Sequence, residues 1–415
     1  MALGQQPPPL EALDSDAQPV RSQLTALKGK LESLPPKPER DELQQATAAD
    51  LNSRRQALSD QFWQRHAATA YHQLTDGGRR FLRVKQLVNE ATRQFPGLLP
   101  TEAEMQRERS LLQRDKEGLE IDQGVFVGHV LGDRECGLHL IHAMSLPTPQ
   151  ALASLEQFRR EGSIDLGPIR VDRRGAIGHI TIQNHQFLNS EDDLSTQALE
   201  TAVDLVLLDP QIAVSALRGG EATHPKHKGR RVFGAGINLT HLYHGRISLV
   251  GFFVERELGS VSKMYRGHPS GAFRTGDLEQ CQEKPFIAAV ESFAIGGACQ
   301  WLLVMDRVIA NRDSYFNLPA RKEGIVPGLA NLRLPRFVGE RRARQAIFFN
   351  RDFAASSAEG ALLADEVVEP AEMEVAIERA AAELQNAGVA SLTANRRQLR
   401  LGAEPLDTFR AYMAG

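Results

Sequence analysis

Cysteine is scarce in this sequence. Only Cys136, Cys281 and Cys299 occur in 415 residues, and no two of them have the C-x-x-C spacing. A disulfide framework, as in small extracellular domains, needs more cysteines than this. A thiolate metal site needs cysteines that are spaced more closely. The sequence therefore predicts three ordinary reduced thiols.

Long apolar runs are also missing. No segment approaches the eighteen or so uncharged residues of a membrane-spanning helix, and Met1–Leu10 lacks the basic start and apolar centre of a secretory signal. The net charge of -3 offers no basic surface for phosphate groups. We therefore expect a cytoplasmic protein that binds neither membrane nor nucleic acid.

Common metal-binding patterns are absent as well. None of the twelve histidines is followed two places later by Asp or Glu, and no H-E-x-x-H occurs. The pairs His139/His142 and His241/His244 have a spacing that meets on a helix, but neither pair has a carboxylate partner. We expect packed or exposed histidines and no metal.

The length is enough for two domains, and the pattern changes along it. Because proline cannot continue a helix interior, Pro7–Pro9 and Pro35-Pro36 predict a largely irregular arm over residues 1–40. Apolar residues at helical spacing follow over 41–95, where Gly77-Gly78 predicts a break between two helices. Thr101 and Glu104 form a capping-box pattern for a polar helix over 101–120. Residues 1–165 are predicted to form a helical domain.

Strand signals begin only after Gly162. Strands and helices then alternate, which predicts an α/β core over residues 166–340 and a helical C-terminal region over 341–415. The expected strands are 169–171, 177–183, 212–217, 286–290 and 307–310, and the expected helices are 194–208, 248–265, 297–305, 341–349 and much of 371–415.

Two glycine-containing turns carry the chemistry. Gly234-Ala235-Gly236-Ile237-Asn238-Leu239 follows one strand signal, and Gly296-Gly297-Ala298-Cys299-Gln300 opens a helix about sixty residues later. One such turn is weak evidence, because glycine turns between strand and helix are common for steric reasons. Two of them can direct two main-chain N–H groups at one developing oxyanion, and a helix N-terminus adds positive potential there.

These segments resemble the two oxyanion-hole turns of the crotonase (enoyl-CoA hydratase/isomerase) superfamily. The similarity continues through Asn317-Leu318-Pro319, residues 324–328 and residues 357–368, and it covers roughly residues 168–405. It implies a β/α spiral core, an acyl-CoA substrate, a C-terminal helical region used for oligomerisation, and a homotrimer or dimer of trimers. The N–H donors would be those of Ile237 and Gly297. The neighbouring positions Ala235, Gly236, Asn238, Leu239, Gly296 and Ala298 would contact the substrate.

Two departures from the hydratase pattern are informative. Hydratases of this superfamily carry two glutamates that handle water and a proton, and the matching positions here are Gln300 and Ala320. Simple hydration is therefore not expected. With the helical N-terminal extension, the sequence most resembles a branch that uses dioxygen, without metal or organic cofactor, to convert 3,5-dihydroxyphenylacetyl-CoA into 3,5-dihydroxyphenylglyoxylate and CoA, within antibiotic biosynthesis.

Polar side chains for the substrate ring are chosen on the same resemblance. Glu191, Arg256 and Gln300 would reach the phenol oxygens, and Ile325 and Val326 would line a dry pocket for dioxygen. All of them except Gln300 have a structural alternative: Glu191 as a helix-start acid, Arg256 as one half of an ion pair, and the two aliphatic side chains as ordinary core.

The coenzyme A phosphates call for cations. The basic run 224–231, with His224 and Lys226, would bind them, with His185 as a weaker choice; the alternative is a solvated basic loop.

Two other functions remain open, another crotonase-type acyl-CoA enzyme (thioester hydrolase, isomerase or decarboxylase) and a non-catalytic acyl-CoA-binding partner protein. The sequence identifies neither the proton acceptor nor the role of residues 1–165.

Overall fold

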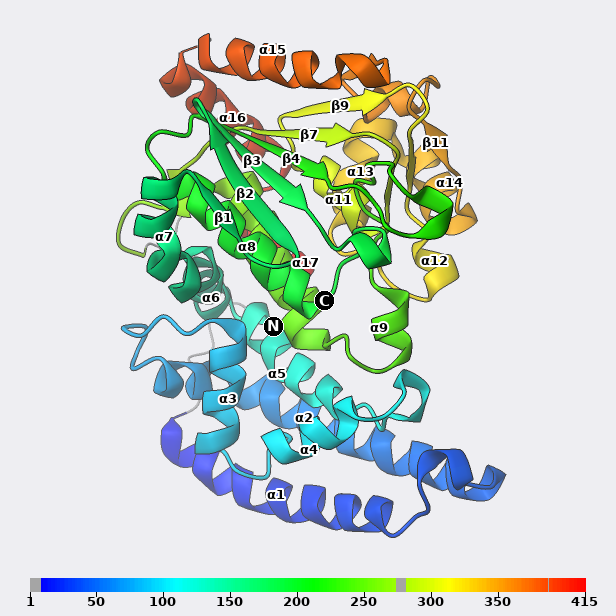
Figure 1. Cartoon of the computed structure of the whole chain (residues 1–415). Helices are drawn as coiled ribbons and strands as arrows, with labels where there is room; N and C mark the ends of the chain where they lie inside the picture. Colours follow the sequence, from blue (N-terminus) through cyan, green and yellow to red (C-terminus); the bar gives the residue numbers. More distant parts are fainter. Residues whose placement is uncertain (1–8, 274–280, 387) are drawn as a thin grey trace.

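The computed structural model describes residues 9–273, 281–386 and 388–415. A layer of helices from the first part of the chain lies against an α/β core built from the rest (Figure 1). In the described ranges, no helix is both long enough and apolar enough to cross a membrane.

The helical layer follows the predicted pattern with two corrections. The predicted break at Gly77-Gly78 is confirmed, because both glycines have positive φ between α2 and α3. The prediction of an irregular arm over residues 1–40 was wrong where α1 lies, because α1 runs through Pro19 and buries Leu13, Ala17 and Leu24 at helical spacing. Residues 1–8 of that arm lie outside the described residues. The polar helix has the predicted Thr101–Glu104 capping box but ends at Arg109. The helices of this layer are α1 (Leu10–Glu32), α2 (Glu42–Leu74), α3 (Val84–Gln94), α4 (Glu102–Arg109), α5 (Glu120–Gly132), α6 (Arg134–Ser145) and α7 (Pro149–Glu161).

One apolar cluster joins this layer to later parts of the chain. Trp63, Phe126 and their neighbours share a buried cluster with Leu258 and Leu329 of the core and with Phe409 near the C-terminus. The helical layer therefore packs directly on elements that, as described below, border the main cavity.

The central sheet has seven strands in the order β1-β2-β3-β4-β7-β9-β12. The first three pair antiparallel, and every pairing from β3 to β12 is parallel. All five predicted strands are present. The strands are β1 (Ser163–Asp165), β2 (Ile169–Arg174), β3 (Ile177–Ile182), β4 (Val214–Gly219), β7 (Phe286–Val290), β9 (Arg307–Asn311) and β12 (Glu366–Val368).

A smaller sheet lies beside the first, in the order β11-β10-β8, and a two-stranded pair, β5 with β6, stands apart. Within the small sheet, β8 leads directly into the second glycine turn. Its strands and those of the pair are β8 (Phe293–Ile295), β10 (Tyr315–Asn317), β11 (Phe353–Ala354), β5 (His268–Pro269) and β6 (Cys281–Gln282).

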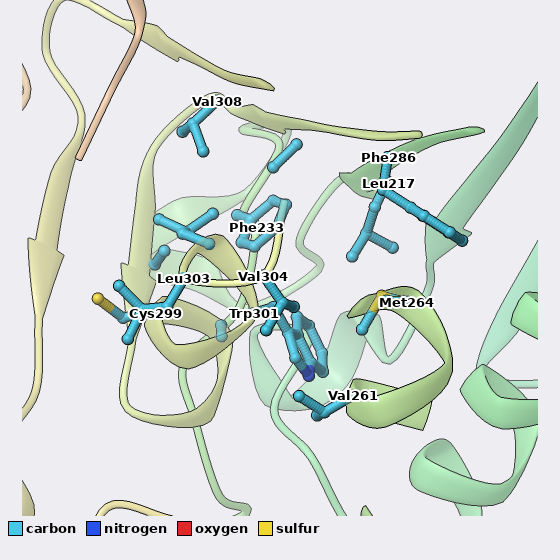
Figure 2. Close-up of a cluster of buried hydrophobic side chains, with 14 of the residues drawn as sticks. Leu217, Phe233, Val261, Met264, Phe286, Cys299, Trp301, Leu303, Val304 and Val308 are labelled. Atoms are coloured by element: carbon cyan, nitrogen blue, oxygen red, sulfur yellow. The ribbon is translucent and has the colours of Figure 1, made fainter. Parts of the chain in front are cut away.

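Helices cover both faces of the main sheet. On one face, α8 and α11 contribute to a large core in which Trp301 lies near Val261 and Val304 (Figure 2). On the other face, α15 packs Met373, Ile377 and Ala380 against the strands. The predicted core and C-terminal helices are confirmed. They are α8 (Asp193–Leu208), α9 (Leu239–Tyr243), α11 (Gly297–Leu302), α12 (Ala320–Glu323), α13 (Ala330–Val338), α14 (Glu340–Phe349), α15 (Met373–Asn386), α16 (Val389–Ala403) and α17 (Leu406–Ala414).

The predicted helix over 248–265 is present but irregular. It contains two π-helical segments, Leu249–Val254 and Glu257–Val261, before α10 (Ser262–Arg266). The wider π turns, which are frequent at functional sites, place Arg256 at the junction between the two segments.

Candidate active site

A cavity of about 1050 Å³ lies where the two glycine turns meet the irregular helix. Its volume is at the upper end of the range for small-molecule sites, and its lining is mostly apolar with a few polar groups. The structure brings most of the predicted site residues together around it. These are Glu191, Ala235, Gly236, Ile237, Leu239, Arg256, Gly296, Gly297, Gln300, Ile325 and Val326.

The two glycine turns are held side by side by main-chain hydrogen bonds. Gly234 N donates to Phe293 O at 3.3 Å, and Ile295 N donates to Gly234 O at 3.0 Å. Glu191 fixes the first turn from its other side, because its N–H donates to Gly236 O and its carbonyl accepts from Asn238 N, both at 2.7 Å. The residues on both sides of Ile237 are thus held by hydrogen bonds to Glu191.

The main-chain amides of Ile237 and Gly297 are left without partners. Neither N–H donates a hydrogen bond to a protein atom in the described ranges, although both residues line the cavity. Both residues are half-buried, and most backbone N–H groups in the interior of folded proteins have a partner. Two free donors on adjacent turns are what an oxyanion hole requires.

Glycine is needed at both turns for steric reasons. A Cβ on Gly297 would lie 1.8 Å from Glu191 Oε1, which no side chain can tolerate. Gly236 has a φ of +77°, and a Cβ there would lie 3.0 Å from the Ile295 carbonyl oxygen. The glycines therefore allow the close approach of the two turns.

Arg256 is the centre of a buried ionic cluster beside the second turn. Its Nε donates to Glu191 at 2.5 Å, one terminal nitrogen donates to Glu257 at 2.6 Å and Gln300 at 3.1 Å, and the other donates to the Gly297 carbonyl at 2.7 Å and Glu191 at 3.4 Å. These five bonds use all five N–H donors of the guanidinium. Arg256 therefore holds its neighbours in place and has no donor left for a substrate.

The orientation of Gln300 follows from Arg256. Because the amide oxygen of Gln300 accepts from Arg256, the amide nitrogen is turned away from the cluster. That nitrogen has no partner among the described protein atoms, and Gln300 lines the cavity. Gln300 thus presents hydrogen-bond donors to a ligand.

Glu191 is a buried carboxyl group next to the two glycine turns. Burial raises the pKa of Glu191 above its ordinary value, and the charge of Arg256 opposes that rise. Glu191 precedes the N-cap of α8, where the capping role belongs to Asp192. Glu191 is thus an acid at the start of α8, and its side chain pairs with Arg256.

Two features of the site were missed in the sequence. Glu257 lines the cavity and pairs with Arg256, and its only sequence signal is a second charge next to Arg256 in an apolar helix. The C-terminal helix α17 also lines the cavity through Ala411, Tyr412 and Met413, which no local pattern predicts because the contact depends on the complete fold.

The remaining predicted residues lie outside the cavity lining. Asn238 is buried and caps α9 by accepting from His241 N, and Ala298 is buried beneath Gly234. His224 and Lys226 are exposed on the basic loop, next to His185, whose carbonyl accepts from Thr223 N at 3.2 Å. In residues 9–273, 281–386 and 388–415, no three His, Cys, Asp or Glu side chains are grouped to hold a metal ion.

Comparisons with known proteins found relatives of this chain. Residues 271–411 match the enoyl-CoA hydratase/isomerase family model. The (3,5-dihydroxyphenyl)acetyl-CoA 1,2-dioxygenase of Amycolatopsis orientalis is 45% identical over 385 residues, which cover 92% of this chain and 87% of that protein. The short-chain-enoyl-CoA hydratase of Clostridium acetobutylicum is 28% identical over 51% of this chain and 72% of its own length. A solved structure from Pseudomonas aeruginosa is 24% identical, covers 58% of this chain and 94% of that one, and has a TM-score of 0.48.

Proposed function

Because this chain belongs to the crotonase superfamily, we propose that it is a dioxygenase that converts 3,5-dihydroxyphenylacetyl-CoA and dioxygen into 3,5-dihydroxyphenylglyoxylate and CoA. One observation carries the proposal: the oxyanion-hole amides are free, while Gln300 and Ala320 stand where a hydratase has its two carboxylates. The site can stabilise an enolate and lacks the usual means of adding water.

The reaction begins with loss of one α-proton from the aryl-acetyl thioester. The ring and the thioester both acidify that position, and the amides of Ile237 and Gly297 stabilise the enolate oxygen. The electron-rich α-carbon then reduces dioxygen and bonds to it, which gives a peroxide anion. No metal or organic cofactor is required for this step in our proposal.

The peroxide next attacks the thioester carbonyl carbon and expels the CoA thiolate, so that a four-membered peroxy ring forms. Loss of the second α-proton breaks the O–O bond and leaves the α-keto carboxylate. Both atoms of dioxygen enter the product, and the two α-hydrogens leave as protons, one of which is taken up by the CoA thiolate. The apolar cavity lining keeps water from competing for the peroxide.

The side chains of the site fit distinct roles in this proposal. The free amide N–H groups of Gln300 would donate to a phenol oxygen or to the developing charge, and Glu191 would accept from a ring hydroxyl. Ile325 and Val326 would supply the dry side of the cavity where dioxygen reacts. His185, His224 and Lys226, outside the cavity, remain our choice for the CoA phosphates.

The assembly and location remain part of the proposal. We expect a homotrimer or a dimer of trimers in the cytoplasm, and exposed apolar side chains on α13 and α14, among them Phe337, Phe348 and Phe349, favour a protein interface there. Light scattering coupled to size-exclusion chromatography measures the state directly.

Oxygen uptake by metal-stripped protein tests the function. With 3,5-dihydroxyphenylacetyl-CoA, we expect one dioxygen consumed for each CoA released, and the glyoxylate product by mass spectrometry. Release of CoA at an undiminished rate without oxygen would instead identify a thioester hydrolase. Failure to bind any acyl-CoA by calorimetry would favour a non-catalytic partner protein.

A further inference from the structure

The C-terminal helix α17 forms one wall of the cavity. Ala411, Tyr412, Met413 and Gly415 line the cavity, although they are more than a hundred residues away in sequence from the second glycine turn. Figure 1 shows the end of the chain returning to the middle of the molecule. The wall therefore needs a fixed anchor, since chain ends are otherwise among the least ordered parts of a protein.

This segment is anchored at two places, before α17 and within it. Just before α17, the buried carboxylate of Glu404 accepts two hydrogen bonds from Arg333, each at 2.9 Å, one from Arg266 at 2.9 Å and one from Arg336 at 3.2 Å. Within α17, Phe409 is fully buried, and Arg410 donates to the carbonyls of residues 131 and 132 at the end of α5. The segment is held to the core and to the helical layer at once.

Tyr412 connects this wall to the polar end of the cavity. Its hydroxyl donates to Gly328 O at 3.1 Å. Gly328 in turn lies against the polar groups, because a Cβ on it would be 2.9 Å from Gln300 Oε1 and 2.6 Å from Glu257 Oε1. Burial raises the pKa of Tyr412, so its hydroxyl remains a donor at neutral pH. Tyr412 thus lines the same cavity as Gln300 and Glu257 and is joined through Gly328 to the wall beside them.

We propose that Tyr412 is a specificity-determining residue that contacts the acyl group and limits it to a single ring close to the thioester. The inference rests on the proposed function and deepens it, since it names what selects the acyl group. The wall is anchored at Glu404 and Arg410, and the Tyr412 hydroxyl ties the ring itself to Gly328, so a bulkier acyl chain meets the Tyr412 ring. Removing that ring enlarges the cavity that it lines.

Competition between two acyl groups tests this role. For Tyr412→Ala, we expect the ratio of kcat/KM for 2-naphthylacetyl-CoA to that for 3,5-dihydroxyphenylacetyl-CoA to rise at least tenfold, since hydrophobic pockets discriminate by this order. Tyr412→Phe keeps the ring and should leave the ratio within about twofold. Thr408→Ala is the matched control, because Thr408 is exposed on the same helix and does not line the cavity.

A second measurement separates this inference from the function. Dethia-CoA analogues of both thioesters, in which a methylene replaces sulfur, cannot release CoA, and calorimetry gives their affinities without any reaction. If no thioester consumes dioxygen but the affinity ratio shifts tenfold in Tyr412→Ala, the proposed reaction fails and the role of Tyr412 stands. An unchanged ratio in folded Tyr412→Ala and Tyr412→Leu proteins, or an equal loss of affinity for both analogues, overturns the role.

Discussion

Two of the buried ionic clusters in the described part of the chain differ in what they do. The cavity cluster consists of Glu191, Arg256 and Glu257 around Gln300. The sealed cluster consists of Arg83, Glu200, Asp204, Lys263 and His268: Lys263 pairs with Glu200 and Asp204 at 2.7 Å each, His268 pairs with Asp204 at 2.8 Å, and Arg83 pairs with Glu200 at 2.6 Å.

The difference between them lies in what they border. Lys263 and Asp204 are fully enclosed, and Arg83, at the start of α3, ties the helical layer to α8. The cavity cluster borders open space and leaves the amide nitrogen of Gln300 without a partner among the residues that the structure describes. Burial and ion pairing therefore do not by themselves identify a reaction centre, and the cavity beside Gln300 is the reason that we propose one at the cavity cluster.

The sharpest test on the cavity side is Gly297→Ala. The added methyl group would collide with Glu191 Oε1 and push the second turn out of register with Ile237. We expect kcat/KM to fall by about 10³-fold or more, the scale of losing an oxyanion-hole donor, while circular dichroism stays native. Gly29→Ala is a control in open space on α1 and should leave turnover unchanged. Native turnover by Gly297→Ala would contradict the assignment of the turns.

Lys263→Met should have the opposite signature. The substitution leaves Glu200 and Asp204 without their shared cation in an enclosed site, so the free energy of unfolding should fall by about 3 to 5 kcal/mol. Denaturant titration measures the loss, and kcat of the folded fraction at low temperature should change little. A large drop in kcat with unchanged stability would erase the distinction between the two clusters.

Glu404 provides a pH-dependent version of the comparison. Burial alone would raise its pKa, but Arg333, Arg266 and Arg336 lower the pKa of Glu404 to about 2. Because the folded-state pKa of Glu404 is lowered, its ionised carboxylate stabilises the folded protein. This stabilisation is fully present above the unfolded-state pKa near 4.5 and is lost as the pH falls through the folded-state pKa of about 2. At pH 7, the free energy of unfolding of the wild type should exceed that of Glu404→Gln by about 3 kcal/mol. Unfolding titrations from pH 7 to pH 2 should show that gap closing; a constant gap would mean that the charge of Glu404 is not what anchors the segment.

Of these four substitutions, Gln300→Leu is expected to have the smallest effect. The leucine keeps the approximate size but removes the free donor, so kcat should fall by about 10- to 100-fold with little change in unfolding free energy. Stopped-flow mixing with the substrate under oxygen separates the chemical step from CoA release. An unchanged kcat would show that the amide only fills space.

Most of the fold was accessible from sequence because alternation of strands and helices and the two glycine turns are local patterns. The helix α1 was not, since prolines near it suggested disorder, although Leu13, Ala17 and Leu24 already follow a helical period. The π segments around Arg256 leave no local signal that distinguishes them from ordinary helix.

Some residues of the candidate site could likewise be predicted from the sequence, and others could not. Ile237, Gly297 and Gln300 were found because they belong to continuous motifs, and the structure places all three on one cavity. Glu257 and Tyr412 were missed because their proximity arises from contacts between segments remote in sequence. That Arg256 has no spare donor is likewise visible only when all five of its partners are in place.

The use of main-chain amides at the first turn has an evolutionary consequence. Every amino acid except proline supplies the same N–H at position 237, so point mutations there change the side chain and leave the donor in place. In our proposal, related proteins can therefore change the side chains around the substrate carbonyl, and with them the reaction, while the N–H group at position 237 is retained.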